Sequence, residues 1–86
     1  MNIDEVKQTI RRGSEAAAQT KSALEQAGSE TASSQRLVQL TVHDSQNDDV
    51  KSALKILGEM DGEITRALRR IDAAVEHADA YLTALG

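Results

Sequence analysis

The second half of the chain carries the strongest hydrophobic pattern. From Val50 to Leu85, apolar residues recur at alternating spacings of four and three positions, and Asp61 is the one polar member. Because this spacing stays on one side of an α-helix, it predicts a long helix with one apolar face. A second column runs beside the first and widens that face: Ala53, Met60, Ala67, Ala74 and Tyr81. The first column is Val50, Leu54, Leu57, Asp61, Ile64, Leu68, Ile71, Val75, Ala78, Leu82 and Leu85.

The first half shows a weaker heptad pattern, with large apolar residues at its ends and small or polar residues in its middle. This spacing predicts a second long helix that packs against the stronger one. Asn2 is placed to accept hydrogen bonds from the backbone at the helix start, and Glu5 follows three positions later, as in a capping box. The predicted columns are Ile3, Ile10, Ala17, Leu24, Thr31 and Val38, and Val6, Gly13, Thr20, Ala27, Ser34 and Thr41.

The stretch from Gly28 to Ser34 has low helix propensity, because it holds glycine, serine and threonine. A break here gives helices of about 2–27 and 30–43 and a three-helix domain. A continuous or bent helix is favoured, because Val38 keeps the heptad phase set by Leu24. A loop normally loses that phase.

Residues 43–49 are all polar and contain residue types that are typical of turns and helix starts. The sequence therefore predicts an all-α, antiparallel two-helix hairpin in a single domain, with helices at about 2–43 and 47–85 and a turn at about 44–47. Folding back at this turn pairs positions whose numbers add to about 92. That register places Val38 against Leu54, Leu24 against Leu68 and Ile10 against Leu82.

The same register predicts a thin waist halfway along the hairpin, where small residues of the two helices meet. Small residues allow helices to approach closely, so the waist is either a tight crossing point or a hinge or notch that receives a partner. We expect Asp61 to be half solvated there, or bonded to Thr31 or Gln35, because an unpaired buried carboxylate is costly. The predicted waist residues are Gly28, Thr31, Gly58, Asp61 and Gly62.

One hairpin is not expected to bury the whole apolar face of the second helix, because the first helix offers little bulk in its middle. An exposed apolar face of this kind indicates an association surface. The simplest closure is a homodimer that forms a four-helix bundle, and the alternative is a pair with a sister hairpin. The predicted interaction face is Val50, Leu54, Leu57, Met60, Ile64, Leu68, Ile71, Val75, Leu82 and Leu85.

Composition narrows the functional classes. The net charge is −4 and charges of both signs are interleaved, so the basic stripe of a nucleic-acid-binding protein is missing. The chain has no cysteine, and no apolar run is long enough for membrane insertion or for a signal-peptide core. We therefore expect a protein of the cytoplasm, or one exported by a route without a signal peptide.

No residue pattern indicates catalytic, metal-binding or cofactor-binding chemistry. His43 and His77 fall at opposite ends of the predicted hairpin, and the Glu-x-x-His pattern of di-iron bundles is missing. The acids Asp44, Asp48 and Asp49 lack the glycine and distal glutamate of a calcium loop, so helix capping accounts for them better. We expect a protein that is not an enzyme and has no cofactor.

An alanine-rich hairpin of two long helices without cysteine resembles the WXG family of type VII secretion substrates and related helical hairpins of actinobacterial toxin systems. The residues that carry the resemblance are Asp49-Val50, Ala53-Leu54, Ile64, Leu68, Ile71 and the run from Ala78 to Leu82. The turn lacks the Trp-x-Gly of that family, and Leu85 stands where its export signal has an acid. The resemblance therefore implies an adaptor, or a substrate exported with a signal-bearing mate.

These observations favour a non-enzymatic helical protein that associates with itself or with another helical protein. The alternative is an acidic regulator, similar to an antitoxin, that masks a partner protein.

Overall fold

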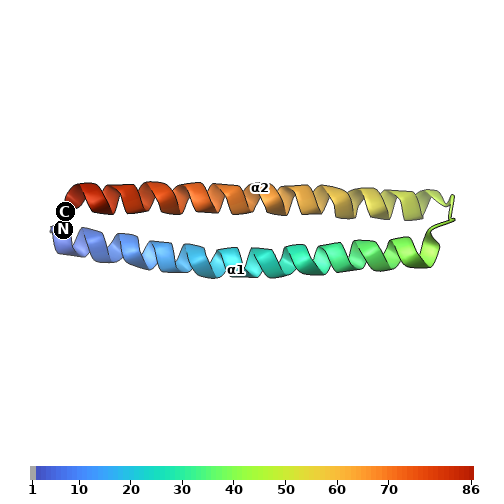
Figure 1. The fold of residues 1–86 in the computed structure, drawn as a ribbon, viewed down its shortest axis with the longest axis horizontal. Helices are drawn as coiled ribbons and strands as arrows, with labels where there is room; N and C mark the ends of the chain where they lie inside the picture. Colours follow the sequence, from blue (N-terminus) through green and yellow to red (C-terminus); the bar gives the residue numbers. More distant parts are fainter. Residues whose placement is uncertain (1) are drawn as a thin grey trace.

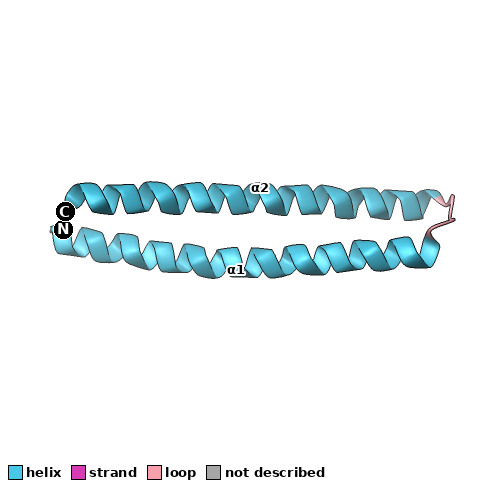
Figure 2. Ribbon diagram, viewed as in Figure 1, coloured by secondary structure: helices cyan, strands magenta, loops and turns pink. Residues whose placement is uncertain are grey.

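The computed structural model describes residues 2–86 and shows an antiparallel hairpin of two long helices (Figures 1 and 2). Helix α1 spans Ile3–Val42 and helix α2 spans Asp48–Leu85. The two termini lie together at one end of a rod that measures 62 × 17 × 15 Å. The predicted all-α hairpin is confirmed, and α1 continues without a break through Gly28 to Ser34.

Local hydrogen bonds define where each helix begins and ends. The Asn2 side chain accepts from the backbone N–H of Glu5 at 2.8 Å, as the sequence predicts. Residues 43–47 form the turn, within which the hydroxyl of Ser45 accepts from the Asn47 N–H at 3.1 Å. At the far end, the N–H of Gly86 donates to the carbonyl of Thr83, and its φ of 87° is one that glycine adopts without strain. Both helices therefore carry caps that their own sequences supply.

Asn47 is the cap of α2, and we expect its replacement to weaken the turn. Its side-chain oxygen accepts from the backbone N–H groups of Asp49 at 2.8 Å and Val50 at 3.3 Å. Asn47→Ala leaves both groups without that acceptor and is expected to lower the free energy of unfolding by about 1 kcal/mol. Urea denaturation followed by circular dichroism measures the change. The matched control is Gln46→Ala, at an exposed position with no capping bond, and an equal loss in both variants would contradict the assignment.

Four contacts between the helices fix the register. Lys7 Nζ donates to the carbonyl oxygen of Gly86 at 2.6 Å, and Lys21 Nζ lies 2.8 Å from Asp72 Oδ1. A methyl group placed on Gly28 would lie 3.4 Å from Ile64 Cγ2, and one placed on Gly58 would lie 3.7 Å from Gln35 Nε2. In every pair the residue numbers add to 92 or 93, so the predicted register is confirmed.

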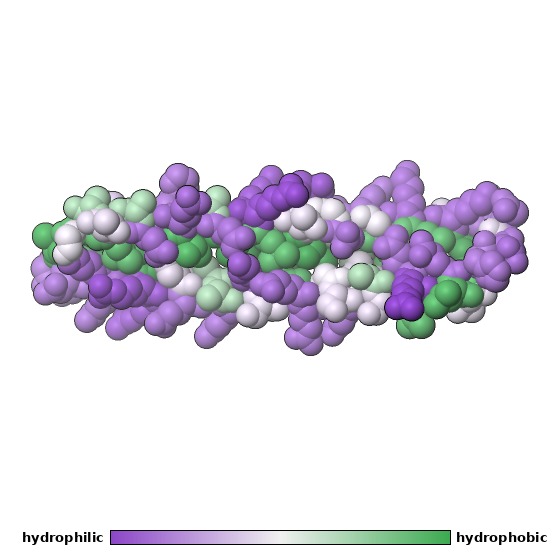
Figure 3. Space-filling view, viewed as in Figure 1, coloured by the Kyte–Doolittle hydropathy of each residue, from purple (hydrophilic) through white to green (hydrophobic). Residues whose placement is uncertain are grey.

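The hairpin has a seam of half-buried residues in place of a closed core. Among residues 2–86 no apolar side chain is fully buried, and Thr31, with 8% of its surface exposed, is the one buried residue. The seam appears in Figure 3 as a hydrophobic band between hydrophilic edges, and it remains visible from outside the molecule. Two helices alone therefore leave much of their apolar surface in contact with water.

Candidate association surface

The predicted interaction face divides between the seam and the surface. Met60 is the member of the predicted interaction face that comes from the second column, and it lies outside the seam with 41% of its surface exposed. Met60 precedes Asp61 in the chain and belongs to the neighbouring column of α2. The nine residues that lie half-buried along the seam are Val50, Leu54, Leu57, Ile64, Leu68, Ile71, Val75, Leu82 and Leu85.

The waist is present at the predicted height, but Asp61 is not enclosed in it. Thr31 is buried there and Gly28 packs beside Ile64. Gly58 lies next to Gln35, and Gly62 is half-buried. Asp61 is exposed, and among residues 2–86 no hydrogen bond joins its carboxylate to Thr31 or Gln35. Full solvation of the carboxylate is the less costly arrangement, because it avoids desolvating a charge.

Gly28 provides a direct test of the waist. An alanine methyl there would be in ordinary contact with Ile64, at 3.4 Å, so Gly28→Ala is expected to raise the free energy of unfolding by about 0.5–1 kcal/mol through helix propensity. Gly28→Leu is expected to lower it by about 1–3 kcal/mol, because the larger side chain has no room against α2. Thermal denaturation of both variants gives the comparison. A leucine variant as stable as the alanine variant would show that the helices are not close at this height.

The second column of the α1 seam differs from the predicted one. Val6 and Ala27 are half-buried as expected, but Gly13, Thr20, Ser34 and Thr41 are exposed. The column one position later in the chain lies in the seam, and its half-buried residues include Ser14, Lys21, Gly28, Gln35 and Val42. Helix α1 is therefore rotated about its axis relative to the prediction, and four of the six residues of a column assigned to the seam lie on the surface.

This rotation brings two columns of small and apolar residues to one long side of the hairpin. Lys7, Lys21 and Gln35 of the α1 seam contact α2 on the opposite side, at Gly86, Asp72 and Gly58. Successive residues of an α-helix are turned by about 100°, so the residues that precede this seam column point away from those contacts. The same holds for the residues that precede Leu54, Leu68, Val75 and Leu82 in α2. We call this side the outer face, and its central residues are Gly13, Thr20, Ala27, Ser34, Thr41, Ala53, Met60, Ala67, Ala74 and Tyr81.

The outer face is the least polar surface of the hairpin. None of its ten central residues is charged. Its margins carry the exposed apolar side chains of Leu37 and Ile56, which have 64% and 55% of their surface exposed, and Tyr81 within it is 52% exposed. The remaining margin residues, one helical position further out, are Ala16, Ala23, Glu30, Glu63, Arg70 and His77.

The opposite side of the hairpin is polar and charged. Lys21 and Asp72 form an ion pair across the helices. The hydrogen bond that Lys21 donates to the Asp72 carboxylate raises the pKa of Lys21 above its usual value, and the charge of Asp72 acts in the same direction. This pair favours the register wherever both side chains carry their charges. Other exposed residues of this side carry both signs, among them Arg11, Glu15, Glu25, Arg36, Lys51, Lys55, Glu76 and Asp79.

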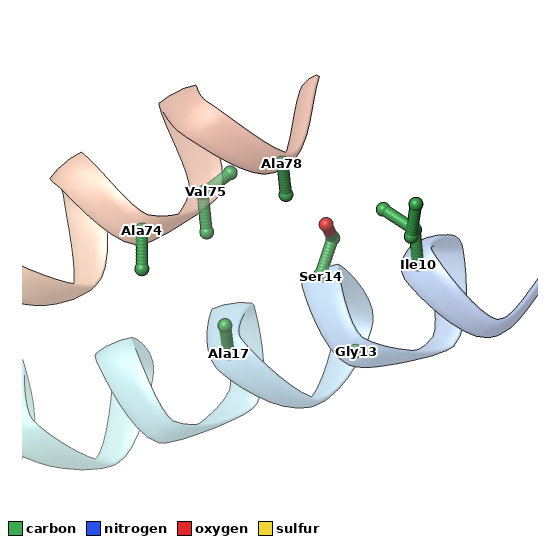
Figure 4. Close-up of a pocket in the computed structure, with 7 residues that line it drawn as sticks. All are labelled: Ile10, Gly13, Ser14, Ala17, Ala74, Val75 and Ala78. Carbon is green, nitrogen blue, oxygen red and sulfur yellow. The ribbon is translucent and has the colours of Figure 1, made fainter. Parts of the chain in front are cut away.

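A shallow apolar groove of about 290 Å³ lies near the open end of the hairpin (Figure 4). Gly13 and Ala74 of the outer face line it, together with seam residues of both helices. The Ser14 side chain extends from α1 toward Ala78, and its hydroxyl oxygen is buried without a hydrogen-bond partner. A second hollow, lined by Glu63, Arg66, Ala67, Arg70 and Ile71, also includes outer-face residues. The first groove therefore lies on the uncharged side of the hairpin, whereas three of the five residues that line the second hollow are charged.

Nine of the ten residues of the predicted interaction face form the α2 side of the seam. The second predicted column of α2, which runs from Ala53 to Tyr81, is the α2 half of the outer face. The α1 half was missed, because its residues are glycine, alanine, serine and threonine and carry no hydrophobic signal.

Within residues 2–86, no group of three or more His, Asp or Glu side chains is arranged to hold a metal ion. In the same part of the chain, neither helix has the length and apolarity together that crossing a bilayer demands.

No protein family, curated protein or solved structure matches this chain.

Proposed function

We propose that this protein is a non-enzymatic association module, in which the hairpin is one half of a four-helix bundle that forms when a second helical hairpin docks on the outer face. The observation that carries the proposal is the exposed area. The chain exposes 6482 Å² at a mass of 9.3 kDa, whereas a compact monomer of that mass exposes about 5,000 Å². The excess of about 1,500 Å² exceeds the roughly 800 Å² that each partner buries in a standard stable interface.

The distribution of side chains supports the outer face as the docking surface. Its central residues are uncharged, and most are small enough to let a second pair of helices approach closely. Antiparallel helical pairs of this kind bury their seams well when a second pair covers them. The opposite side is less suited, because docking there would desolvate many charges.

The oligomeric state tests the proposal. Light scattering coupled to size-exclusion chromatography is expected to give about twice the chain mass of 9.3 kDa at micromolar concentration, or a stable complex when a helical partner is supplied. Ala67→Glu places a charge at the centre of the outer face and is expected to yield a monomer that retains its helical circular dichroism. Thr65→Glu, on the opposite side, is the matched control and is expected to associate as the unchanged chain does. Equal masses for the two variants would contradict the choice of surface.

We extend the proposal to the role that the WXG resemblance implies, an adaptor or an exported mate in a type VII-like secretion or toxin system. Its support is the hairpin architecture and the uncharged outer face. Co-purification from the native host tests it, and recovery of the chain with no helical secretion partner would contradict it. The alternative role, masking a partner through an acidic surface, has weaker support, because the charged side carries Arg36, Lys51 and Lys55 among its acids.

A further inference from the structure

We propose that the occupant of the outer face is a second copy of this chain in the antiparallel orientation, related by a two-fold axis that crosses the hairpin at the level of Ala27 and Ala67. In this arrangement α1 packs on α1 of the second copy and α2 packs on α2. The inference rests on the proposed function and adds the identity, the orientation and the register of the partner.

The sizes of the α2 residues match under this symmetry. The central column of α2 has a residue every seven positions, and Ala67 is its midpoint. A two-fold axis at Ala67 therefore places Met60 opposite Ala74 of the second copy, and Tyr81 opposite Ala53. Each bulky residue meets an alanine, which is the large-to-small complementarity that a closely packed interface needs.

The charges on the α2 margin match as well. Glu63 and Arg70 lie one heptad apart on the same margin, with their midpoint next to Ala67. The two-fold axis sets Glu63 of each copy beside Arg70 of the other, so two charge pairs of opposite sign form per dimer. One heptad further from the axis along the same margin, Ile56 falls opposite His77 of the second copy.

The α1 columns agree with the same axis. Ala27 lies at nearly the same level along the rod as Ala67. Residues of the two helices that lie side by side have numbers that add to 92 or 93, and the numbers of Ala27 and Ala67 add to 94. An axis at Ala27 places Thr20 opposite Ser34 of the second copy, and the exposed Leu37 opposite Ala16. Both helices therefore give complementary pairs about a single axis, although their sequences differ.

The parallel orientation is disfavoured by charge. With the two-fold axis along the rod, α1 would pack on α2 of the second copy and residues of equal level would meet. Glu30 would then face Glu63 of the second copy, and Arg70 would have no acid opposite it. Like charges in contact across an interface oppose association. The antiparallel arrangement places Glu30 opposite Ala23 and avoids this contact.

Disulfide formation tests the axis, because the natural chain has no cysteine and each introduced thiol is unique. Ala67→Cys and, separately, Ala27→Cys are expected to give covalent dimers with themselves on mild oxidation. Thr65→Cys, on the opposite side, is the matched control and is expected to stay mostly uncrosslinked. A mixture of the Ala27→Cys and Ala67→Cys chains that links 27 to 67 in preference would overturn the antiparallel orientation while leaving the proposed association intact.

Charge exchange provides the second readout. Glu63→Arg and Arg70→Glu are each expected to raise the dimer dissociation constant about tenfold or more, because each creates two like-charge contacts per dimer. The double variant, Glu63→Arg with Arg70→Glu, restores both pairs and is expected to return to within about threefold of the unchanged chain. Additive weakening in the double variant would overturn the pairing. A chain that stays monomeric at 100 µM, roughly a hundred times the concentration scale of a micromolar complex, would overturn both this inference and self-association.

Discussion

Replacing Leu68 with aspartate is expected to unfold the hairpin. Leu68 is half-buried in the middle of the seam, and the register places it opposite Leu24. Leu68→Asp removes apolar contact and puts a carboxylate where α1 covers it, at a combined cost of about 3 kcal/mol or more. A small protein whose seam is only half-buried has little stability to spare. Far-ultraviolet circular dichroism at 25 °C is expected to show loss of most of the helical signal.

The matched control for this variant is Thr65→Asp, one turn away on the exposed side of α2. The Thr65 hydroxyl donates only to the Asp61 carbonyl of its own helix, so its replacement is expected to change the free energy of unfolding by less than about 0.5 kcal/mol. If the Leu68→Asp chain keeps its helical signal and melts with the unchanged chain, Leu68 does not lie between the helices.

Replacing Ser14 with alanine is expected to stabilise the protein by about 1–2 kcal/mol. The Ser14 hydroxyl oxygen is buried and has no hydrogen-bond partner, and its surroundings are apolar: Ile10, Ala17, Val75 and Ala78 (Figure 4). A buried hydroxyl without a partner loses its hydrogen bonds to water and gains none in return. Alanine removes that cost and also has higher helix propensity than serine. Urea denaturation gives the difference in the free energy of unfolding.

Ser22→Ala is the matched control, because Ser22 lies in the same helix at an exposed position. It shares the gain in helix propensity and lacks the gain from the buried hydroxyl. The stabilisation by Ser14→Ala is therefore expected to exceed that by Ser22→Ala by about 1 kcal/mol. Equal effects would mean that the Ser14 hydroxyl is solvated or bonded in solution.

The fold was predictable because the apolar column of α2 is long and regular. The apolar face of α2 is clearly defined by Leu54, Leu57, Ile64, Leu68 and Ile71. The polar turn then places the preceding helix antiparallel to it. The register followed from matching large residues of α1 to large residues of α2. Continuity through Gly28 was also predictable, because the heptad phase is the same on both sides of it.

The rotation of α1 was not predictable from hydropathy. The two candidate columns differ by one position, and they offer Gly13 or Ser14, Thr20 or Lys21, and Ser34 or Gln35. None of these choices separates an apolar from a polar residue. The choices between Val6 and Lys7 and between Thr41 and Val42 do, but they favour opposite columns, so the hydrophobic pattern gives no preference. The contacts between the helices determine which column lies in the seam. The amine of Lys21 pairs with Asp72 while the aliphatic part of its side chain covers the seam.

The same ambiguity concealed half of the proposed association surface. Its α2 column contains Met60 and Tyr81 and was visible as a widening of the apolar stripe. Its α1 column is defined only by lacking charge and bulk, which is a weak signal in a sequence rich in alanine and serine. The proposed pairing of Glu63 with Arg70 involves the α2 margin alone, whereas the preference for the antiparallel orientation also needs the position of Glu30 on the α1 margin.

The central claim is that the chain folds back on itself within one subunit, and a distance between spin labels tests it most directly. Labels on cysteines introduced at Glu15 and Asp79, both exposed and near the open end, are predicted to lie about 15–25 Å apart. The distance is expected to persist when the labelled chain is diluted with unlabelled chain. A separation above about 60 Å, or a short distance that disappears on dilution because the helices are exchanged between subunits, would contradict the account.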